Sequence, residues 1–289
     1  MVNKSKPKTT DNNGIYDERN KLNSLTGKEW LKLTKSFMLS EKCAADKDAF
    51  AHPAPFLIKD VEKMISLFTK KGMTVLDPFM GSGTTAIASC NIDRNAVGID
   101  LSEEYKKLAF ERFKNNNIDI KKIQYIHGDS IKELDKISNV DYIITSPPYH
   151  NILKNNSKGL RKDSSAKGYR SGSRIGVDYY SDKKNDLGNQ DTYEEFLILL
   201  QKIMKKAYKK LNEGRYCSII ISDFTVDKKE ICVQGDIVRI MQEIGYEFVG
   251  TIILLQDNKP LYPFGYPYAF KINHNHQNII NFRKPKEDK

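Results

Sequence analysis

The chain has 289 residues, of which 39% are hydrophobic and 29% charged, and its formal net charge is +10 at pH 7. This length supports one large or two small domains with a hydrophobic core, and no apolar run approaches the roughly 20 residues of a membrane span. The four cysteines are widely spaced and form no CxxC pair, which argues against a zinc centre or disulfide framework and fits a reducing cytoplasm. The excess of positive charge favours a polyanionic partner.

The N-terminal segment, residues 1–20, is polar and lysine-rich, so we expect a disordered basic tail. It lacks the apolar stretch of a secretory signal, and none is expected. Hydrophobic residues then recur at near-helical spacing within residues 24–39, namely Leu25, Trp30, Leu33 and Phe37. Core packing is the simplest role for Trp30, the only tryptophan.

From residue 56 onward, apolar runs of helical and strand length alternate. We expect helices at 57–70, 83–91, 102–115 and 130–137, and strands at 73–77, 96–100, 122–127 and 140–145. Residues 150–190 interrupt this alternation, and a helix at 191–211, a strand at 215–222 and a helix at 235–245 follow. The apolar runs 247–255 and 277–283 should pair as antiparallel strands. This order predicts βαβ units, a parallel sheet and an α/β fold.

A glycine-containing turn follows the first of these strands and reads Asp77-Pro78-Phe79-Met80-Gly81-Ser82-Gly83-Thr84-Thr85. Glycines allow a tight turn and the close approach of a ligand to the backbone. A phosphate-binding P-loop needs a lysine after its last glycine, and Thr84 occupies that position, so this class of site is excluded. Gly81-x-Gly83-x-x-Ala86 fits the loose dinucleotide pattern, with Asp100 about 20 residues further on, but this signal alone is weak.

Three aspartates and one rigid turn come at the ends of four successive predicted strands. Asp77, Asp100 and Asp129 follow the first three strands, and Ser146-Pro147-Pro148-Tyr149 follows the fourth. Each aspartate alone could be a helix N-cap. In an open parallel sheet, however, ligands bind at the carboxyl ends of the strands, so these groups should line one crevice. The two prolines donate no hydrogen bonds and stiffen the turn that presents Tyr149.

The combination of DPFMGSGTT and TSPPY resembles the DNA methyltransferases that modify exocyclic amino groups, N4 of cytosine or N6 of adenine. The resemblance covers roughly residues 24–289. It implies a doubly wound, Rossmann-like methyltransferase fold over residues 21–289, with a mostly parallel seven-stranded sheet and an antiparallel closing strand. It also implies S-adenosylmethionine as methyl donor and double-stranded DNA as substrate. Whether a cognate restriction endonuclease acts separately, and whether the protein is a monomer or a homodimer, stay open.

By resemblance, the turn from Asp77 to Gly83 holds the methionine end of the cofactor, Asp100 bonds the ribose hydroxyls and Asp129 bonds the adenine amine. Ile99 and Leu101 could flank the adenine ring, although core packing suits both. The stretch from His52 to Phe56 resembles the cofactor-pocket segment of the family. The cofactor-binding residues predicted in this way are His52, Pro53, Phe56, Asp77, Pro78, Phe79, Gly81, Ser82, Gly83, Thr84, Asp100, Leu101 and Asp129.

The predicted catalytic residues are Ser146, Pro147, Pro148 and Tyr149. The Ser146 hydroxyl and the Pro147 carbonyl would accept hydrogen bonds from the target amine, and Tyr149 would stack on the extruded base. Carbon-5 methylation needs a cysteine, typically after a proline, and no cysteine here follows a proline. Many adenine-directed relatives carry Asp or Asn where Ser146 stands, which favours N4 of cytosine. N6 of adenine, an RNA substrate and an inactive DNA-binding homologue are the alternatives.

Residues 151–184 hold nine Lys or Arg against three Asp and are rich in Gly and Ser. This composition predicts a flexible basic DNA-contacting insertion over residues 150–190, or a solvated loop. In residues 260–271, PLYPFGYPYAFK, aromatic residues recur at every second position from 262, which fits either a stacking surface or hairpin packing. For His274 and His276, polar or DNA contacts are favoured over a metal. The candidate DNA-binding residues are Lys154, Lys158, Arg161, Lys162, Arg170, Arg174, Tyr266 and His274.

Overall fold

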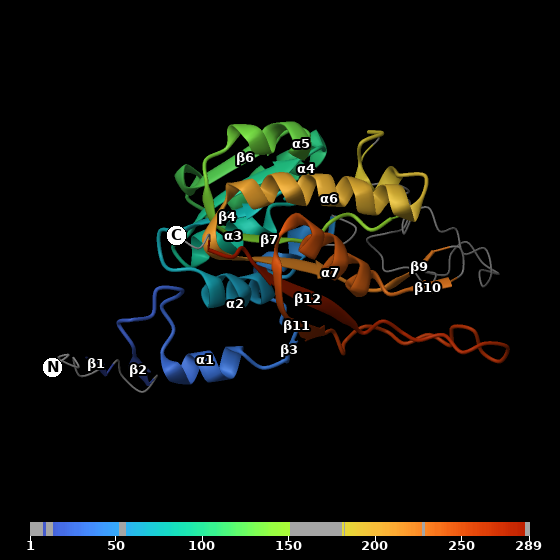
Figure 1. Cartoon of the computed structure of the whole chain (residues 1–289), viewed down its shortest axis with the longest axis horizontal. Helices are drawn as coiled ribbons and strands as arrows, with labels where there is room; N and C mark the ends of the chain where they lie inside the picture. The colour runs from blue at the N-terminus through green and yellow to red at the C-terminus, as the bar shows by residue number, and fades with distance from the viewer. Residues whose placement is uncertain are drawn as a thin grey trace.

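The computed structural model describes residues 8–9, 14–51, 56–150, 181, 183–226 and 229–286 (Figure 1). Its α-helices are α1 (Gly27–Leu33), α2 (Ile58–Phe68), α3 (Thr84–Asn91), α4 (Glu103–Asn115), α5 (Ser130–Glu133), α6 (Tyr193–Lys210) and α7 (Val233–Ile244). Its strands are β1 (Lys8–Thr9), β2 (Ile15–Tyr16), β3 (Phe37–Leu39), β4 (Thr74–Asp77), β5 (Asn95–Asp100), β6 (Ile123–His127), β7 (Val140–Thr145), β8 (Leu211–Ile221), β9 (Phe224–Val226), β10 (Lys229–Ile231), β11 (Glu247–Leu255) and β12 (His276–Arg283). Short 3₁₀ turns lie at Ala44–Ala51, Ile120–Lys122, Leu134–Lys136 and Leu187–Asn189.

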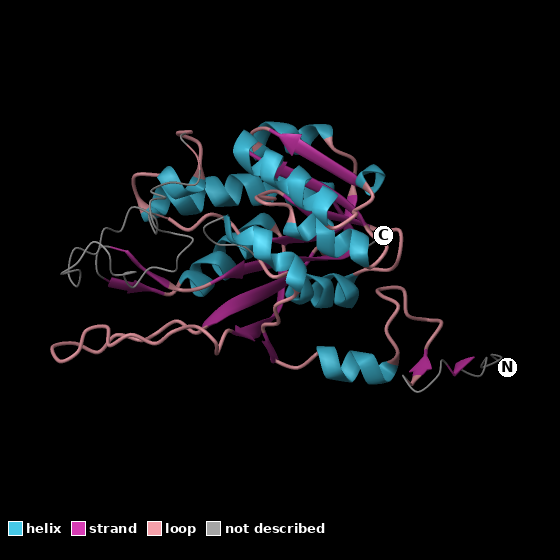
Figure 2. Ribbon diagram, turned by 180° about the vertical axis from the view of Figure 1, so that it is seen from behind, coloured by secondary structure: helices cyan, strands magenta, loops and turns pink. Residues whose placement is uncertain are grey.

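Eight strands form the central sheet, in the order β3-β11-β12-β8-β7-β4-β5-β6. β12 runs antiparallel to both of its neighbours, β8 and β11, and the other pairs in the sheet are parallel. The predicted α/β fold with a mostly parallel sheet, and the predicted antiparallel pairing of the last two strands, are therefore confirmed. The helices lie on both faces of this sheet (Figures 1 and 2).

The order of the strands reverses between β4 and β7. From β4 the chain continues outward to β5 and β6 on one side, and it then returns to place β7 and β8 on the other side of β4. The loops that leave β4 and β7 at their carboxyl ends therefore diverge. Such a point in a doubly wound sheet is where ligands bind.

Side-chain alternation along the strands sends hydrophobic groups into two cores. On β7, Ile143 packs in the core beneath α6 and α7, whereas Tyr142 and Ile144 pack in the core formed with α2, α3 and α4. Strands buried on both faces are the reason why these segments are continuously apolar in the sequence. Among the described residues, no helix is both long and apolar enough to cross a bilayer.

The N-terminal region differs from the sequence prediction in two respects. Helix α1 covers only Gly27–Leu33, held at its start by a reciprocal capping box between Thr26 and Glu29. It buries no residue, and Trp30 is 40% exposed, so the prediction that Trp30 packs in the core is wrong. Residues 37–39 then form β3, which pairs in parallel with β11 and makes the sheet eight-stranded instead of seven-stranded. Pairing with a strand more than 200 residues away outweighs the local helical spacing.

Two small antiparallel pairs lie outside the central sheet and were not predicted: β1 with β2, and β9 with β10. The β1–β2 pair falls within residues 1–20, where the sequence predicted a disordered tail. Nearby, the Lys70 ammonium lies 3.3 Å from the Tyr16 hydroxyl. Residues 1–7 and 10–13 of that predicted tail lie outside the described residues.

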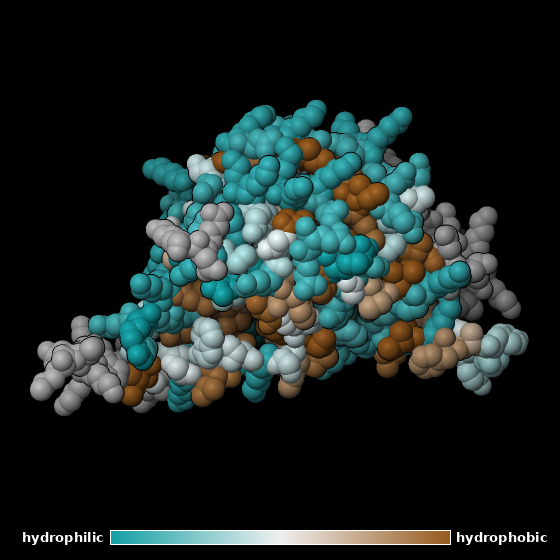
Figure 3. Space-filling model, viewed as in Figure 1, coloured by the Kyte–Doolittle hydropathy of each residue, from teal (hydrophilic) through white to brown (hydrophobic). Residues whose placement is uncertain are grey.

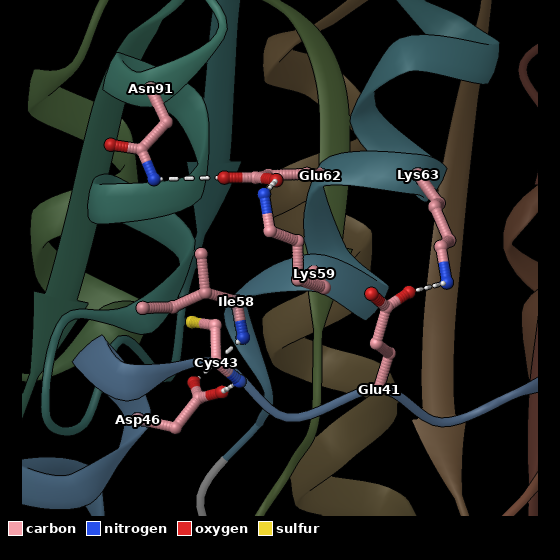
Figure 4. A network of polar contacts seen from close by, with 8 residues as sticks. All are labelled: Glu41, Cys43, Asp46, Ile58, Lys59, Glu62, Lys63 and Asn91. Carbon is pink, nitrogen blue, oxygen red and sulfur yellow. Dashed lines mark hydrogen bonds and ion pairs between the residues drawn. The ribbon is translucent and has the colours of Figure 1, made fainter.

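A polar network fastens the segment before α2 to the body of the fold (Figure 4). The buried Asp46 carboxylate accepts hydrogen bonds from the backbone N–H groups of Cys43, at 2.7 Å, and Ile58, at 2.9 Å. Glu62 on α2 in turn bonds Asn91 at the end of α3, at 2.8 Å. Asp46 thus holds together the two flanks of the predicted segment from His52 to Phe56.

Candidate active site

The glycine turn after β4 has the backbone conformation that its sequence predicted. Gly81 and Gly83 have φ values of +50° and +82°, in the left-handed region that L side chains rarely adopt. A Cβ atom on Gly83 would also lie 2.7 Å from the Phe113 ring, which is closer than real contacts allow. Glycine is therefore required at position 83 both for the turn and for the packing of α4 behind it.

Asp77 lies beneath this turn and joins it to the neighbouring loop. Its carboxylate accepts hydrogen bonds from the Phe79 N–H at 3.0 Å and from the hydroxyls of Thr85 and Thr145, both at 2.6 Å. Its side chain is buried, and this burial raises its pKa to about 6. Thr145 is the last residue of β7. Asp77 therefore connects the loops that leave β4 and β7 at the point where the strand order reverses, here called the switch point.

Asp100 stands at the end of β5, as predicted, and also holds the glycine turn. One carboxylate oxygen accepts from the Gly81 N–H and the other from the Ser102 N–H, each at 2.8 Å. Ser102, and not Asp100, is the N-cap of α4. Burial raises the pKa of Asp100 to about 6, against the lowering effect of the two N–H donors. The N-cap interpretation is therefore excluded for this aspartate.

Asp129, in contrast, is a helix N-cap. It caps α5 by accepting from the Ile131 N–H at 2.9 Å. Its second oxygen accepts from the Asn185 side chain at 2.8 Å. The bond to Asn185 ties the segment before α6 to the ends of the strands.

One pocket lies at this edge of the sheet, among the carboxyl ends of the parallel strands where ligands of doubly wound sheets bind. Its described lining comes from the ends of β4, β5, β6 and β7, from the segment before α6 and from helices α4, α5 and α6. These residues are Pro78, Phe79, Asp100, Leu101, Tyr105, Asp129, Ser130, Ser146, Pro147, Pro148, Tyr149, Ser181, Asn185, Asp186, Leu187 and Ile203. The structure thus brings the predicted aspartates at positions 100 and 129 together with the predicted catalytic turn.

Other predicted cofactor residues lie elsewhere. The predicted residues that are not among the described lining residues are Asp77, Gly81, Ser82, Gly83 and Thr84. Phe56 packs against the core beside α2. Ile99 is fully buried in the core, whereas Leu101 lines the pocket. His52 and Pro53 lie outside the described residues.

Tyr149 is held at both ends. Its ring stacks on Phe224, with centroids 5.6 Å apart, and its hydroxyl accepts from the Ser222 N–H at 2.9 Å and from the Gln277 side chain at 3.0 Å. Only 6% of the residue is exposed, yet it lines the pocket beside Ser146. The ring is therefore fixed in orientation by groups on β9 and β12 and by Ser222, which directly follows β8.

Arg112 on α4 was not predicted as a site residue. Its Nη1 lies 2.7 Å from the Ser82 carbonyl, 3.1 Å from the Ser82 hydroxyl and 2.9 Å from the Thr84 hydroxyl. The side chain is fully buried, and burial lowers its pKa. A charged residue on the apolar face of a helix, next to Ala109 and Phe113, was the signal that could have identified it.

The segment before α6 was also missed as part of the pocket. Asp186 caps the short turn Leu187–Asn189 and accepts from the Ser181 hydroxyl at 2.6 Å, so the segment folds into a compact unit. The sequence prediction assigned this region to DNA contact. No local pattern indicates that it returns over the strand ends.

Of the candidate DNA-binding residues, Lys154, Lys158, Arg161, Lys162, Arg170 and Arg174 lie outside the described residues. Tyr266 is 80% exposed. His274 lies with its Nε2 2.8 Å from a carboxylate oxygen of Glu230 on β10.

The family model named N6_N4_Mtase, described as DNA methylase, matches residues 2–111 and 140–289. The chain belongs to this family. Membership confirms the resemblance seen in the sequence and implies S-adenosylmethionine as the cofactor.

Individual relatives match over shorter stretches. The orphan methyltransferase M.BamHII of Bacillus amyloliquefaciens is 45% identical over 75 residues, which cover 26% of this chain and 28% of that protein. The type II methyltransferase M.BglI of Bacillus subtilis is 38% identical over 94 residues, covering 32% of this chain and 24% of that protein. Each match thus covers less than a third of either protein. Among solved structures, TrmN from Thermus thermophilus aligns with a TM-score of 0.49 and 15% identity, over 85% of this chain and 54% of that one.

Proposed function

We propose that the protein is a site-specific DNA methyltransferase acting in the cytoplasm as a single catalytic domain. It transfers a methyl group from S-adenosylmethionine to the N4 amine of a cytosine flipped out of double-stranded DNA. The observation that carries the proposal is that Ser146-Pro147-Pro148-Tyr149 and Asp100 line the same pocket at the switch point of the sheet. Membership of the DNA methylase family supports the same reaction class.

The residues present fit the cofactor. Asp100 lines the pocket, and each of its oxygens that accepts a backbone N–H retains lone pairs for a ribose hydroxyl. Leu101, Tyr105 and Phe79 supply apolar surface for a flat ring. When bound, S-adenosylmethionine would supply a methyl group on a sulfonium, from which a neutral thioether is a good leaving group.

The catalytic task of the chain is to position an amine. An exocyclic amine is a weak nucleophile because its lone pair is delocalised into the base. If the Ser146 hydroxyl and the Pro147 carbonyl accept its two hydrogens, the lone pair is directed away from them and toward the methyl donor. Pro147 is buried and Pro148 half-buried, so both acceptors stand on a rigid segment.

Tyr149 supplies the stacking surface for the extruded base. Its hydroxyl is already occupied by Ser222 and Gln277, so we assign it an anchoring role and leave the ring to contact the base. Serine at position 146 supports cytosine, because many adenine-directed relatives carry Asp or Asn there. Its hydroxyl can accept from the amine and still donate to the ring N3 of cytosine. An ionised carboxylate at that position could only accept.

The test is to incubate genomic DNA with the purified protein and S-adenosylmethionine, digest it to nucleosides and separate them by mass spectrometry. N4-methylcytosine is expected. N6-methyladenine alone would overturn the assignment of the base, and product on RNA alone would overturn the assignment of DNA. The variant Ser146→Ala should lose turnover and keep cofactor affinity. Ser138→Ala, at the exposed opposite end of β7, is the matched control and should retain both.

A further inference from the structure

Between β11 and β12 the chain leaves the sheet as a long hairpin, residues 256–275, here called the aromatic finger (Figures 1 and 2). Its outer part exposes Tyr266, Tyr268 and Phe270 by 80%, 94% and 94%. In the space-filling view, hydrophobic colour gathers along the lower right edge, from which the finger projects, while hydrophilic side chains cover much of the upper part (Figure 3). Clustered exposed rings of this size indicate an interaction surface.

The finger is internally braced. The Tyr262 N–H donates to the Asn273 side chain at 3.0 Å, and the Asn273 amide donates back to the Tyr262 carbonyl at 2.8 Å. At the tip, the Gly265 carbonyl accepts from the N–H groups of Tyr268 and Ala269, at 2.8 and 2.7 Å. Because the rings are held outward on a braced hairpin, binding through them requires little further ordering.

The root of the finger lies beside the predicted catalytic turn Ser146-Pro147-Pro148-Tyr149, here called the amine clamp because we expect it to hold the target amine. β12 begins beside the carboxyl end of β8, so the finger emerges from the edge of the sheet that carries the pocket. At the root, Gln256 donates to the Gln277 side chain at 3.2 Å, and Gln277 donates to the Tyr149 hydroxyl at 3.0 Å. The root of the finger, though not its exposed rings, is therefore hydrogen-bonded to the residue that we expect to stack on the target base.

We propose that the aromatic finger contacts duplex DNA beside the target nucleotide by stacking Tyr266, Tyr268 and Phe270 on exposed bases. The inference rests on the proposed function, since extruding a base leaves its neighbours partly unstacked. Aromatic rings stack on every base and need no particular sequence. The charges support a polyanion as the occupant, because Lys259 and Lys271 outnumber Asp257 within the finger and the chain carries +10 overall.

The test uses the double variant Tyr268→Ser/Phe270→Ser in the full chain. The control is Ile120→Ser, an apolar residue 57% exposed that precedes β6 at the opposite edge of the sheet. Affinity for a fluorescein-labelled duplex of mixed sequence is measured by anisotropy at several salt concentrations, and S-adenosylmethionine affinity by calorimetry. The double variant should bind DNA about 10- to 100-fold more weakly. The slope of log affinity against log salt should not change, because no counterion-releasing charge is lost.

DNA affinity equal to that of the wild type would overturn the inference. So would sedimentation showing that the double variant loses a dimer while keeping DNA affinity, because the rings would then pack against a second copy. A measurement on the unaltered chain guards against misfolding of the variant. Duplex DNA containing 5-iodouracil should photocrosslink to residues 266–270, and crosslinks found only elsewhere would also overturn the inference. Wild-type protein that crosslinks through the finger but forms no methylated nucleoside would refute the proposed function and support the finger contact.

Discussion

The variant Arg112→Met tests whether the glycine turn after β4, here called the cofactor turn because we propose that it holds the cofactor, depends on the guanidinium buried behind it. Arg112 Nη1 shares its two hydrogens among three oxygens of the turn, at 2.7, 2.9 and 3.1 Å. Methionine has a similar length and fills space but donates nothing. The Ser82 carbonyl, which lies 2.7 Å from the guanidinium, would lose that charged donor.

The magnitude follows from two opposing contributions. Hydrogen bonds to a charged group are worth about 1.5–3 kcal/mol each, so the loss of two would cost about 3–6 kcal/mol. Removing a fully buried charge regains part of its desolvation cost, and we expect a net loss of about 2–4 kcal/mol in the free energy of unfolding. For a chain of this size that corresponds to a fall in Tm of about 3–7 °C.

Calorimetric unfolding and isothermal titration with S-adenosylmethionine measure the two consequences. The folded variant should bind the cofactor at least about tenfold more weakly, because the turn loses its support. Arg239→Met is the matched control: Arg239 is half exposed on α7, pairs with Glu243 at 3.0 Å and should change stability by less than about 1 kcal/mol. If Arg112→Met matched the wild type in both Tm and cofactor affinity, the supporting role of Arg112 would be refuted.

Three further outcomes are expected. Asp100→Ala should weaken S-adenosylmethionine binding by about 1.5–3 kcal/mol, and unchanged affinity in calorimetry of a folded variant would contradict the ribose assignment. Changing Lys158, Arg161 and Lys162 together to glutamine should flatten the log-affinity against log-salt slope for DNA by up to about 2.7, at about 0.9 per phosphate contact, and an unchanged slope would indicate a solvated loop. Asp77 has a pKa of about 6 in the fold against an ordinary 3.8, so the protonated carboxyl favours folding. Its stabilising contribution is complete below pH 4 and falls by about 3 kcal/mol as the pH rises through 6. Asp77→Asn should remove this fall in chemical denaturation at pH 4 and pH 7, and parallel pH profiles would refute the assignment.

The local pattern of apolar residues was sufficient to predict the helices and strands that surround the pocket. The strand expected at 140–145 is β7, Val140–Thr145, and the helix expected at 102–115 is α4, Glu103–Asn115. Both segments carry a clear apolar pattern and a clear boundary signal. Two prolines follow shortly after β7, and the Ser102 N-cap precedes α4. Because parallel strands bring their carboxyl ends to one edge, the convergence of residues 100, 129 and 146 could also be predicted.

What the sequence could not predict depends on contacts between distant segments. β3 forms because β11 offers a free edge, and nothing within residues 24–39 indicates it. The segment before α6 reaches the pocket through the bond from Asn185 to Asp129, 56 residues apart in the chain. For residues 260–271, hairpin packing and an exposed stacking surface both fitted the alternation of aromatic residues. The exposure of Tyr268 and Phe270 excludes packing for those two rings.

The two most recognisable motifs of the chain are physically one unit. The first residue of DPFMGSGTT, Asp77, accepts a hydrogen bond from the first residue of TSPPY, Thr145, at 2.6 Å, although 68 residues separate them. Asp77 also accepts from Thr85, later in its own motif, so the cofactor turn is tied both to its helix and to the amine clamp. A shift of one loop would break a buried hydrogen bond to the other. The proposed transfer of a methyl group between two bound molecules would require a fixed separation between their sites. We propose that this buried carboxylate, beneath both loops and outside the pocket lining, maintains that separation.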